Sequence, residues 1–148
     1  MKTIVISGAS SKVGKTTLAG KVCEILPGAV HVKIGHGAIK PGMGNIFYPH
    51  GTGFERIEAE NRGAPFLVIE SNGILREIDP DLAIYLPGGS PKPSAAEAAE
   101  KADIVGGGRI GRGAIREIAE RLGVAVEAAS SIAAAAGNVM EETDDQLR

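Results

Sequence analysis

The stretch from Ile4 to Leu18 constrains the fold most strongly, because a strand, a turn of small residues and a helix start follow one another there. The run Ile4–Ile6 is apolar on both faces, as strands in the interior of a parallel sheet are. Gly8 and further small residues end that run, and apolar residues return at helical spacing from Leu18 onward. The stretch therefore predicts a strand–loop–helix unit, the building block of parallel α/β sheets.

Between this strand and helix, residues 9–17 read Ala-Ser-Ser-Lys-Val-Gly-Lys-Thr-Thr, which is typical of a phosphate-binding loop. The strict motif is Gly-x-x-x-x-Gly-Lys-Ser/Thr; here Ala9 takes the first position, as a tolerated variant, and Gly8 precedes it. Backbone N–H groups of such a loop and the positive end of the following helix face an anion. The residues expected to contact a nucleotide are Gly8, Ala9, Ser10, Ser11, Lys12, Val13, Gly14, Lys15, Thr16 and Thr17.

Two side chains of this loop and one acid further along carry the expected chemistry. Lys15 would neutralise the β- and γ-phosphates, and the Thr16 hydroxyl would bind Mg²⁺. Glu70 ends an apolar strand, where phosphate-loop proteins usually carry an acid that holds the metal directly or through water. We therefore expect Lys15 and Glu70 to be catalytic, and Thr16 and Glu70 to be the metal ligands. Two alternatives stay open: Lys12 either reaches a phosphate or faces solvent, and Glu70 is otherwise a solvated strand end.

The rest of the chain alternates apolar strand segments with helical ones, which predicts a three-layer α/β domain with a mainly parallel sheet of about five strands. The expected strands are 3–7, 29–34, 65–70, 82–86 and 103–105, and the expected helices are 16–26, 54–61, 94–101, 110–122 and 128–136. Ser94 is the expected N-cap of its helix. Residues 35–53 are interpreted as a glycine-rich loop, and 72–78 as a turn or a single helical turn. The chain, 1–148, is interpreted as one domain whose last residues are frayed.

Ligands of parallel sheets lie beyond the carboxyl ends of the strands, so polar residues that follow strands should meet there. Lys33, His36 and Lys40 surround the end of the second strand and suit a second anion, such as a substrate carboxylate or phosphate. Ser71 and Asn72 follow the third strand and could hold substrate or water. Lys33, His36 and Asn72 are thus the predicted substrate residues. The alternatives are solvated loop charges and, for Asn72, ordinary turn chemistry.

Net charge, the length of apolar runs and the spacing of histidines argue against nucleic-acid binding, membrane association and a zinc site. A formal net charge of −2 gives no electrostatic pull toward nucleic acid or acidic membranes. We find no signal peptide and no run of roughly 18 apolar residues, so we expect a cytoplasmic protein. His31, His36 and His50 lack metal-site spacing and a cysteine partner, which argues against zinc. The single cysteine, Cys23, is expected to be a small buried residue on the first helix.

Residues 115–132 look like a helix-turn-helix DNA reader. The segment that would be the recognition helix, 127–136, contains no Lys or Arg, and phosphate contacts need those charges. We therefore expect no nucleic-acid partner. These helices should pack on the sheet or against a partner subunit, which is compatible with a homodimer.

On Ala9–Thr17, on Val30–His36 with its basic end and on Leu67–Glu70, the chain resembles the phosphate-loop NTPases. Within that group it is most similar to the MobB-like adaptors of molybdopterin-guanine dinucleotide biosynthesis. The resemblance implies the P-loop NTPase fold and weak, Mg²⁺-dependent GTP hydrolysis. It also implies a partner enzyme that loads a nucleotide onto molybdopterin.

Three functions stay open on the sequence. The first is an accessory protein that binds and slowly hydrolyses NTP for a cofactor-biosynthesis enzyme. The second is a small-molecule kinase, in which the His36 loop and Asn72 hold the acceptor and Arg109 and Arg112 close over the phosphates. The third is a nucleotide-sensing module without catalysis. GTP and ATP are not distinguished, since the Asn-Lys-x-Asp signature is absent; Pro87–Pro93 is the expected base-side loop.

Overall fold

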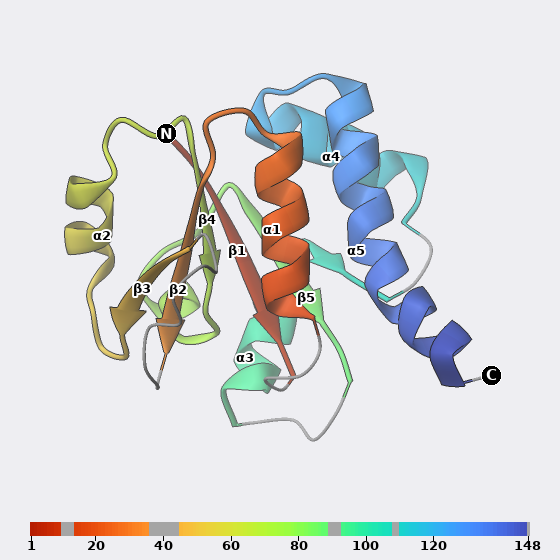
Figure 1. The fold of residues 1–148 in the computed structure, drawn as a ribbon, viewed down its shortest axis with the longest axis horizontal. Helices are drawn as coiled ribbons and strands as arrows, with labels where there is room; N and C mark the ends of the chain where they lie inside the picture. Colours follow the sequence, from red (N-terminus) through yellow and green to blue (C-terminus); the bar gives the residue numbers. More distant parts are fainter. Residues whose placement is uncertain (10–13, 36–44, 89–92, 108–109, 148) are drawn as a thin grey trace.

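The structure is a computed structural model that describes residues 1–9, 14–35, 45–88, 93–107 and 110–147; the side chains of 93–94 and 138–147 lie outside the description. Within these residues a six-stranded sheet runs in the order β3-β2-β4-β1-β5-β6 (Figure 1). All neighbouring strands are parallel. The strands are β1 (Lys2–Gly8), β2 (Val30–Gly35), β3 (Ile46–Pro49), β4 (Phe66–Glu70), β5 (Leu82–Leu86) and β6 (Ile104–Val105). The helices are α1 (Lys15–Ile25), α2 (Phe54–Glu60), the short 3₁₀ helix η1 (Gly73–Arg76), α3 (Pro93–Lys101), α4 (Arg112–Leu122) and α5 (Val126–Leu147). The predicted α/β class with a parallel sheet is confirmed.

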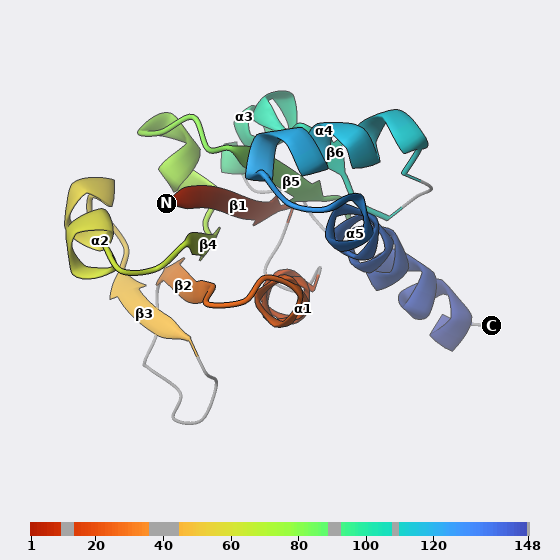
Figure 2. The same ribbon diagram turned by 90° about the horizontal axis from the view of Figure 1, so that it is seen from above.

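Helices cover both faces of the sheet, so the fold has three layers (Figure 2). On one face α1 and α5 lie side by side, and α4 packs against α5. On the other face lie α2, η1 and α3. Successive residues of β1 alternate between the two: Ile4 and Ile6 join the core under α1, whereas Val5 joins the core on the opposite face. All three side chains are fully buried, as expected for the middle strand of a doubly covered parallel sheet.

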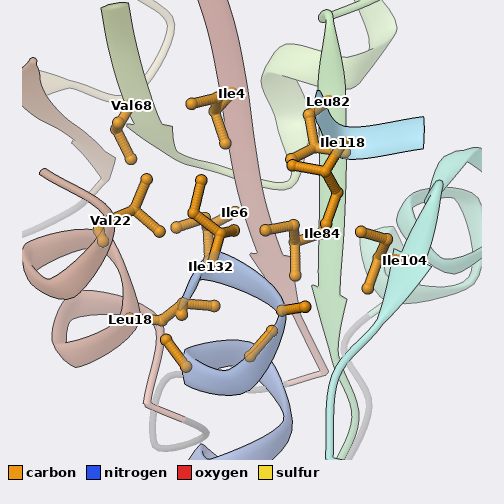
Figure 3. Packing of buried hydrophobic residues seen from close by; sticks show 14 of the residues in the cluster. Ile4, Ile6, Leu18, Val22, Val68, Leu82, Ile84, Ile104, Ile118 and Ile132 are labelled. Atoms are coloured by element: carbon orange, nitrogen blue, oxygen red, sulfur yellow. The ribbon is translucent and has the colours of Figure 1, made fainter. Parts of the chain in front are cut away.

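The core under α1 is aliphatic (Figure 3). Leu18 and Val22 from α1 meet Ile84 of β5 and Ile132 of α5 there, all with no exposed surface. Burying one such side chain contributes about 1.5–3 kcal/mol. This packing holds the first turn of α1 at a fixed place over the sheet.

The last two helices belong to this core and form no separate module. Ile118 and Leu122 of α4 and Ile132 and Ala136 of α5 are buried within it. The prediction that these helices pack on the sheet is thus confirmed. The helix expected over 128–136 is longer in the structure and continues to Leu147.

A strand inside the predicted glycine-rich loop was missed. Residues 46–49 form β3, which pairs in parallel with β2 from Val32↔Ile46 to Gly35↔Pro49. Only one side of this edge strand needs a partner, so a short segment ending in proline can form it. Residues 36–44 of the predicted loop lie outside the described residues.

Of the five predicted helices only α2 starts where expected: α1 and α3 begin one residue early, α5 two residues early and α4 two residues late. The third helix begins at Pro93, so Ser94 lies inside its first turn and is not the N-cap. Proline favours this first helical position because its fixed φ suits the helix and its missing N–H would have no helical partner there. The fourth helix begins at Arg112, two positions after the expected Ile110.

The connections that leave β1 and β4 go to opposite faces of the sheet. β1 leads into α1 on one face, whereas β4 leads into η1 on the other. β1 and β4 are direct neighbours, in register from Lys2↔Phe66 to Ile6↔Glu70. Neighbouring parallel strands with diverging connections mark the edge where α/β proteins bind ligands.

A substitution at Gly106, which lies between β5 and α5, tests how closely these elements pack. A Cβ atom at this position would lie 2.5 Å from Leu86 Cδ2 and 2.9 Å from the Ala136 carbonyl oxygen. Because that oxygen belongs to the α5 backbone, we expect Gly106→Ala to lower the free energy of unfolding by about 1–3 kcal/mol, as overpacking does. Urea denaturation measures this loss. In the control Gly113→Ala the new Cβ meets nothing within 4 Å, so stability should stay equal or rise by up to about 1 kcal/mol. Wild-type stability for Gly106→Ala would contradict the close approach.

Candidate functional site

The start of α1 lies at the edge where β1 and its neighbours end (Figure 1). Gly14 precedes the helix with φ 91° and ψ 20°, a left-handed conformation that glycine adopts without steric cost. Its carbonyl accepts the Leu18 N–H at 3.0 Å and so begins the helical hydrogen bonds. Lys15 and Thr16 are the first residues of the helix. Of the predicted phosphate loop, Ser10, Ser11, Lys12 and Val13 lie outside the described residues.

The first turn of α1 carries no acidic residue, and no side chain among the described residues caps it. The leading N–H groups of a helix have no partner within the helix, and the helix dipole adds positive potential there. An anion at this position would meet donors, and no acidic residue of the first turn itself would repel it. The local geometry therefore suits a phosphate group.

Gly8 and Ala9 frame the entrance of the loop through contacts to the protein itself. The Gly8 N–H donates to Asn72 Oδ1 at 2.9 Å, and Asn72 Nδ2 donates back to the Gly8 carbonyl at 2.9 Å. The Ala9 N–H donates to the Leu86 carbonyl at 3.0 Å. These two N–H groups are engaged within the protein, so their part in the site is to fix where the loop leaves the sheet. The predicted substrate role of Asn72 stays a prediction.

Thr16, Glu70 and His31 form one hydrogen-bonded chain beneath the start of α1. The Thr16 hydroxyl donates to Glu70 Oε1 at 2.7 Å, and His31 Nε2 lies 2.5 Å from Glu70 Oε2. The side chains of His31 and Glu70 are only 7% and 2% exposed. Each carboxylate oxygen of Glu70 thus has its own partner.

Opposing influences act on the pKa of Glu70. Burial works to raise this pKa, but the hydrogen bonds from His31 and Thr16 and the positive charge of Lys33 outweigh burial and hold it below its ordinary value. Glu70 is therefore ionised at neutral pH. An ionised carboxylate only accepts hydrogen bonds, so Nε2 of the His31 ring must carry a hydrogen.

The parallel register explains how these polar side chains meet. Lys33 of β2 is paired with Glu70 of β4, and His31 is paired with Val68. Strand residues two apart share a face, so His31 and Lys33 lie on the α1 side of the sheet with Glu70. Lys33 thus lies next to Glu70, and its predicted substrate role stays a prediction. His36, the third predicted substrate residue, lies outside the described residues.

The donor set of Thr16 and Glu70 fits a magnesium ion. Mg²⁺ prefers oxygen ligands and usually takes one or two from the protein. The Thr16 hydroxyl gives its single hydrogen to Glu70, so only its lone pairs remain, and these suit a cation. Among the described residues no group of three or more His, Cys, Asp or Glu side chains could hold a metal by itself. A metal here would need further ligands from water or a phosphate.

The sequence prediction missed His31 as a site residue, since it considered this histidine only as a zinc ligand. A polar residue in an apolar strand was the available signal, because His31 stands between Val30 and Val32. Its contact with Glu70 spans 39 positions of the chain and depends on β2 lying beside β4.

Cys23 lies on α1, as predicted, and is partly buried against the core of that face. Burial, and then the negative charge of Glu70, raise the pKa of the Cys23 thiol to about 11. The thiol therefore stays protonated and unreactive at neutral pH.

No protein-family model, no curated protein and no solved structure matches the chain. Among the residues that the structure describes, no helix has the length and apolar character needed to cross a membrane.

The depressed pKa of Glu70 predicts a pH-dependent contribution to stability. A carboxyl group with a lower pKa in the folded state adds stability that is fully present above its ordinary value of 4.5 and is lost as the pH falls through the folded value. In metal-free buffer, the difference in unfolding free energy between wild type and Glu70→Gln should shift against wild type as the pH falls below about 4.5. Urea denaturation across this range measures it. The same difference at every pH would show that Glu70 has no such partners.

Proposed function

We propose that this chain binds a nucleoside triphosphate with Mg²⁺ at the edge where β1 and β4 end, and hydrolyses it slowly. The observation that carries the proposal is the hydrogen bond between Thr16, in the first turn of α1, and the buried Glu70 at the end of the adjacent strand. It joins a Gly-Lys-Thr helix start to an acid on the neighbouring strand. Phosphate-loop NTPases combine the same two parts around a nucleotide and its metal.

Each residue has a distinct task in this proposal. The first-turn N–H groups of α1 hold phosphate oxygens, and Gly14 lets the backbone approach them closely. Lys15 neutralises the charge of the β- and γ-phosphates as a point charge. Thr16 and Glu70 hold the magnesium ion, with Thr16 as the ligand and Glu70 fixing the direction of the Thr16 hydroxyl. Bound there, Mg²⁺ neutralises charge that develops on the phosphates.

The biological setting follows from the sequence resemblance to MobB-like adaptors. We propose an accessory protein that uses its nucleotide site to assist a partner enzyme of the molybdopterin-guanine dinucleotide type in the cytoplasm. GTP is the expected nucleotide in that setting. Lys33, which is paired with Glu70, would attract a second, anionic ligand to the same edge of the sheet.

Replacing Lys15 tests the nucleotide site. Lys15→Ala removes a charged phosphate contact, which is worth about 1.5–3 kcal/mol, so nucleotide triphosphate affinity should fall roughly 10- to 100-fold. Isothermal titration calorimetry with GTP and with ATP, each with Mg²⁺, measures it. The matched control is Lys2→Ala, which removes a lysine that pairs with Asp81 at 3.9 Å at the opposite end of β1. The control should bind like wild type, and unchanged affinity in Lys15→Ala would contradict the phosphate-loop assignment.

Turnover then separates the three functions that the sequence left open. An accessory protein hydrolyses nucleotide slowly without any acceptor. A kinase consumes it quickly only when its acceptor is present, and a sensor binds it without consuming it. Phosphate release by the wild-type protein alone, measured with GTP and with ATP, is therefore the second assay.

A further inference from the structure

His31 is a buried polar residue for which the proposed function has no task. It lies in β2 on the face that α1 covers, where it is paired with Val68 of β4 in an otherwise apolar surrounding. Its Nε2 atom contacts Glu70 Oε2, the carboxylate oxygen that Thr16 does not use. The side chain is only 7% exposed, so a ligand would reach it with difficulty. Any influence of His31 on the site must therefore pass through Glu70.

We propose that His31 is a positioning residue that fixes the Glu70 carboxylate and thereby sets the affinity of the nucleotide site for Mg²⁺. This inference rests on the proposed function, because it assigns His31 a task at the same metal. His31 holds one oxygen of Glu70, and the second oxygen then points at the Thr16 hydroxyl. Thr16 in turn presents its lone pairs to the cation.

The directions of the two hydrogen bonds to Glu70 explain why Thr16 is left as a ligand for a cation. Glu70 is an acceptor only, so both His31 and Thr16 donate to it. A hydroxyl that has given away its hydrogen cannot donate to a phosphate and is left as a ligand for a positive ion. Without His31, the Glu70 carboxylate can rotate about its last bond, and the Thr16 hydroxyl loses its fixed acceptor. Outer partners that orient metal ligands change metal affinity by about 10- to 100-fold.

A purely structural role makes a different prediction. If His31 only satisfied a buried carboxylate, its removal would lower stability and leave the magnesium dependence of nucleotide binding unchanged. A positioning role changes that dependence and spares binding in the absence of metal. The ratio of nucleotide affinity with Mg²⁺ to affinity with EDTA therefore separates the two.

The test compares His31→Leu with His31→Gln in the full chain. The probes are the non-hydrolysable imido analogues of GTP and ATP, titrated calorimetrically in EDTA and in millimolar Mg²⁺. We expect His31→Leu to bind like wild type in EDTA and about tenfold more weakly with Mg²⁺. The Gln variant has a terminal N–H₂ at nearly the reach of Nε2, so it should recover most of the loss. If His31→Leu does not fold, His31→Asn replaces it, because the shorter amide falls short of Glu70.

A double variant shows whether His31 acts through Glu70. Glu70→Gln should itself weaken binding with Mg²⁺, and adding His31→Leu to it should cause less than about a twofold further loss, since coupled residues are not additive. Tyr48→Phe is the matched control. It removes a hydroxyl from a buried side chain that bonds Glu60 at 2.6 Å, away from Thr16 and Glu70. It should leave the magnesium ratio at the wild-type value.

The outcomes are distinct. A selective loss with Mg²⁺ in His31→Leu, with recovery in His31→Gln, supports the inference. An unchanged magnesium ratio in folded His31→Leu or His31→Asn overturns it and leaves the nucleotide site standing, as does an equal loss in EDTA. If the wild-type protein binds neither analogue, the proposed function fails and this inference fails with it.

Discussion

The hydrogen bond from the Thr16 hydroxyl to Glu70 is the interaction on which the account of the site depends. It connects two segments that lie 54 positions apart, the first turn of α1 and the end of β4. Its geometry requires β1 and β4 to be adjacent and α1 to be seated on the sheet, and the core around Leu18 and Val22 provides that seat. The aliphatic packing thus positions the polar chemistry at the edge.

A buried carboxylate is costly unless it is paired. Here the cost is offset by two donors, and Lys33 adds a nearby positive charge. The fold retains an ionised group at a place where apolar packing would be simpler. A site for a cation and a phosphate would require such a carboxylate at a strand end, beside a helix start that has no acidic residues. The same two donors fix the carboxylate in one orientation, so the site is arranged before any ligand arrives.

Much of the fold could be predicted from the sequence, because hydrophobic pattern decides it. The β1–α1 unit, the strand that ends at Glu70 and the packing of the last helices all follow from apolar spacing. β3 could not be predicted, since an edge strand of four residues among glycines and prolines has no periodicity to read. The contact between His31 and Glu70 was also beyond the sequence. Neighbouring residues say nothing of a partner 39 positions away, and only the strand order places β2 beside β4.

The most direct measurement is a thermal-shift comparison of the wild-type protein with GTP, ATP, GDP and ADP, each with and without Mg²⁺. A ligand that binds the native state raises its stability by mass action, by about 2.7 kcal/mol at a concentration 100 times its Kd. The account predicts a higher melting temperature with a nucleoside triphosphate, and a larger rise when Mg²⁺ is present. GTP should give the larger shift if the resemblance to MobB-like adaptors holds. An unchanged melting temperature with all four nucleotides would contradict the claim that this edge of the sheet is a nucleotide site.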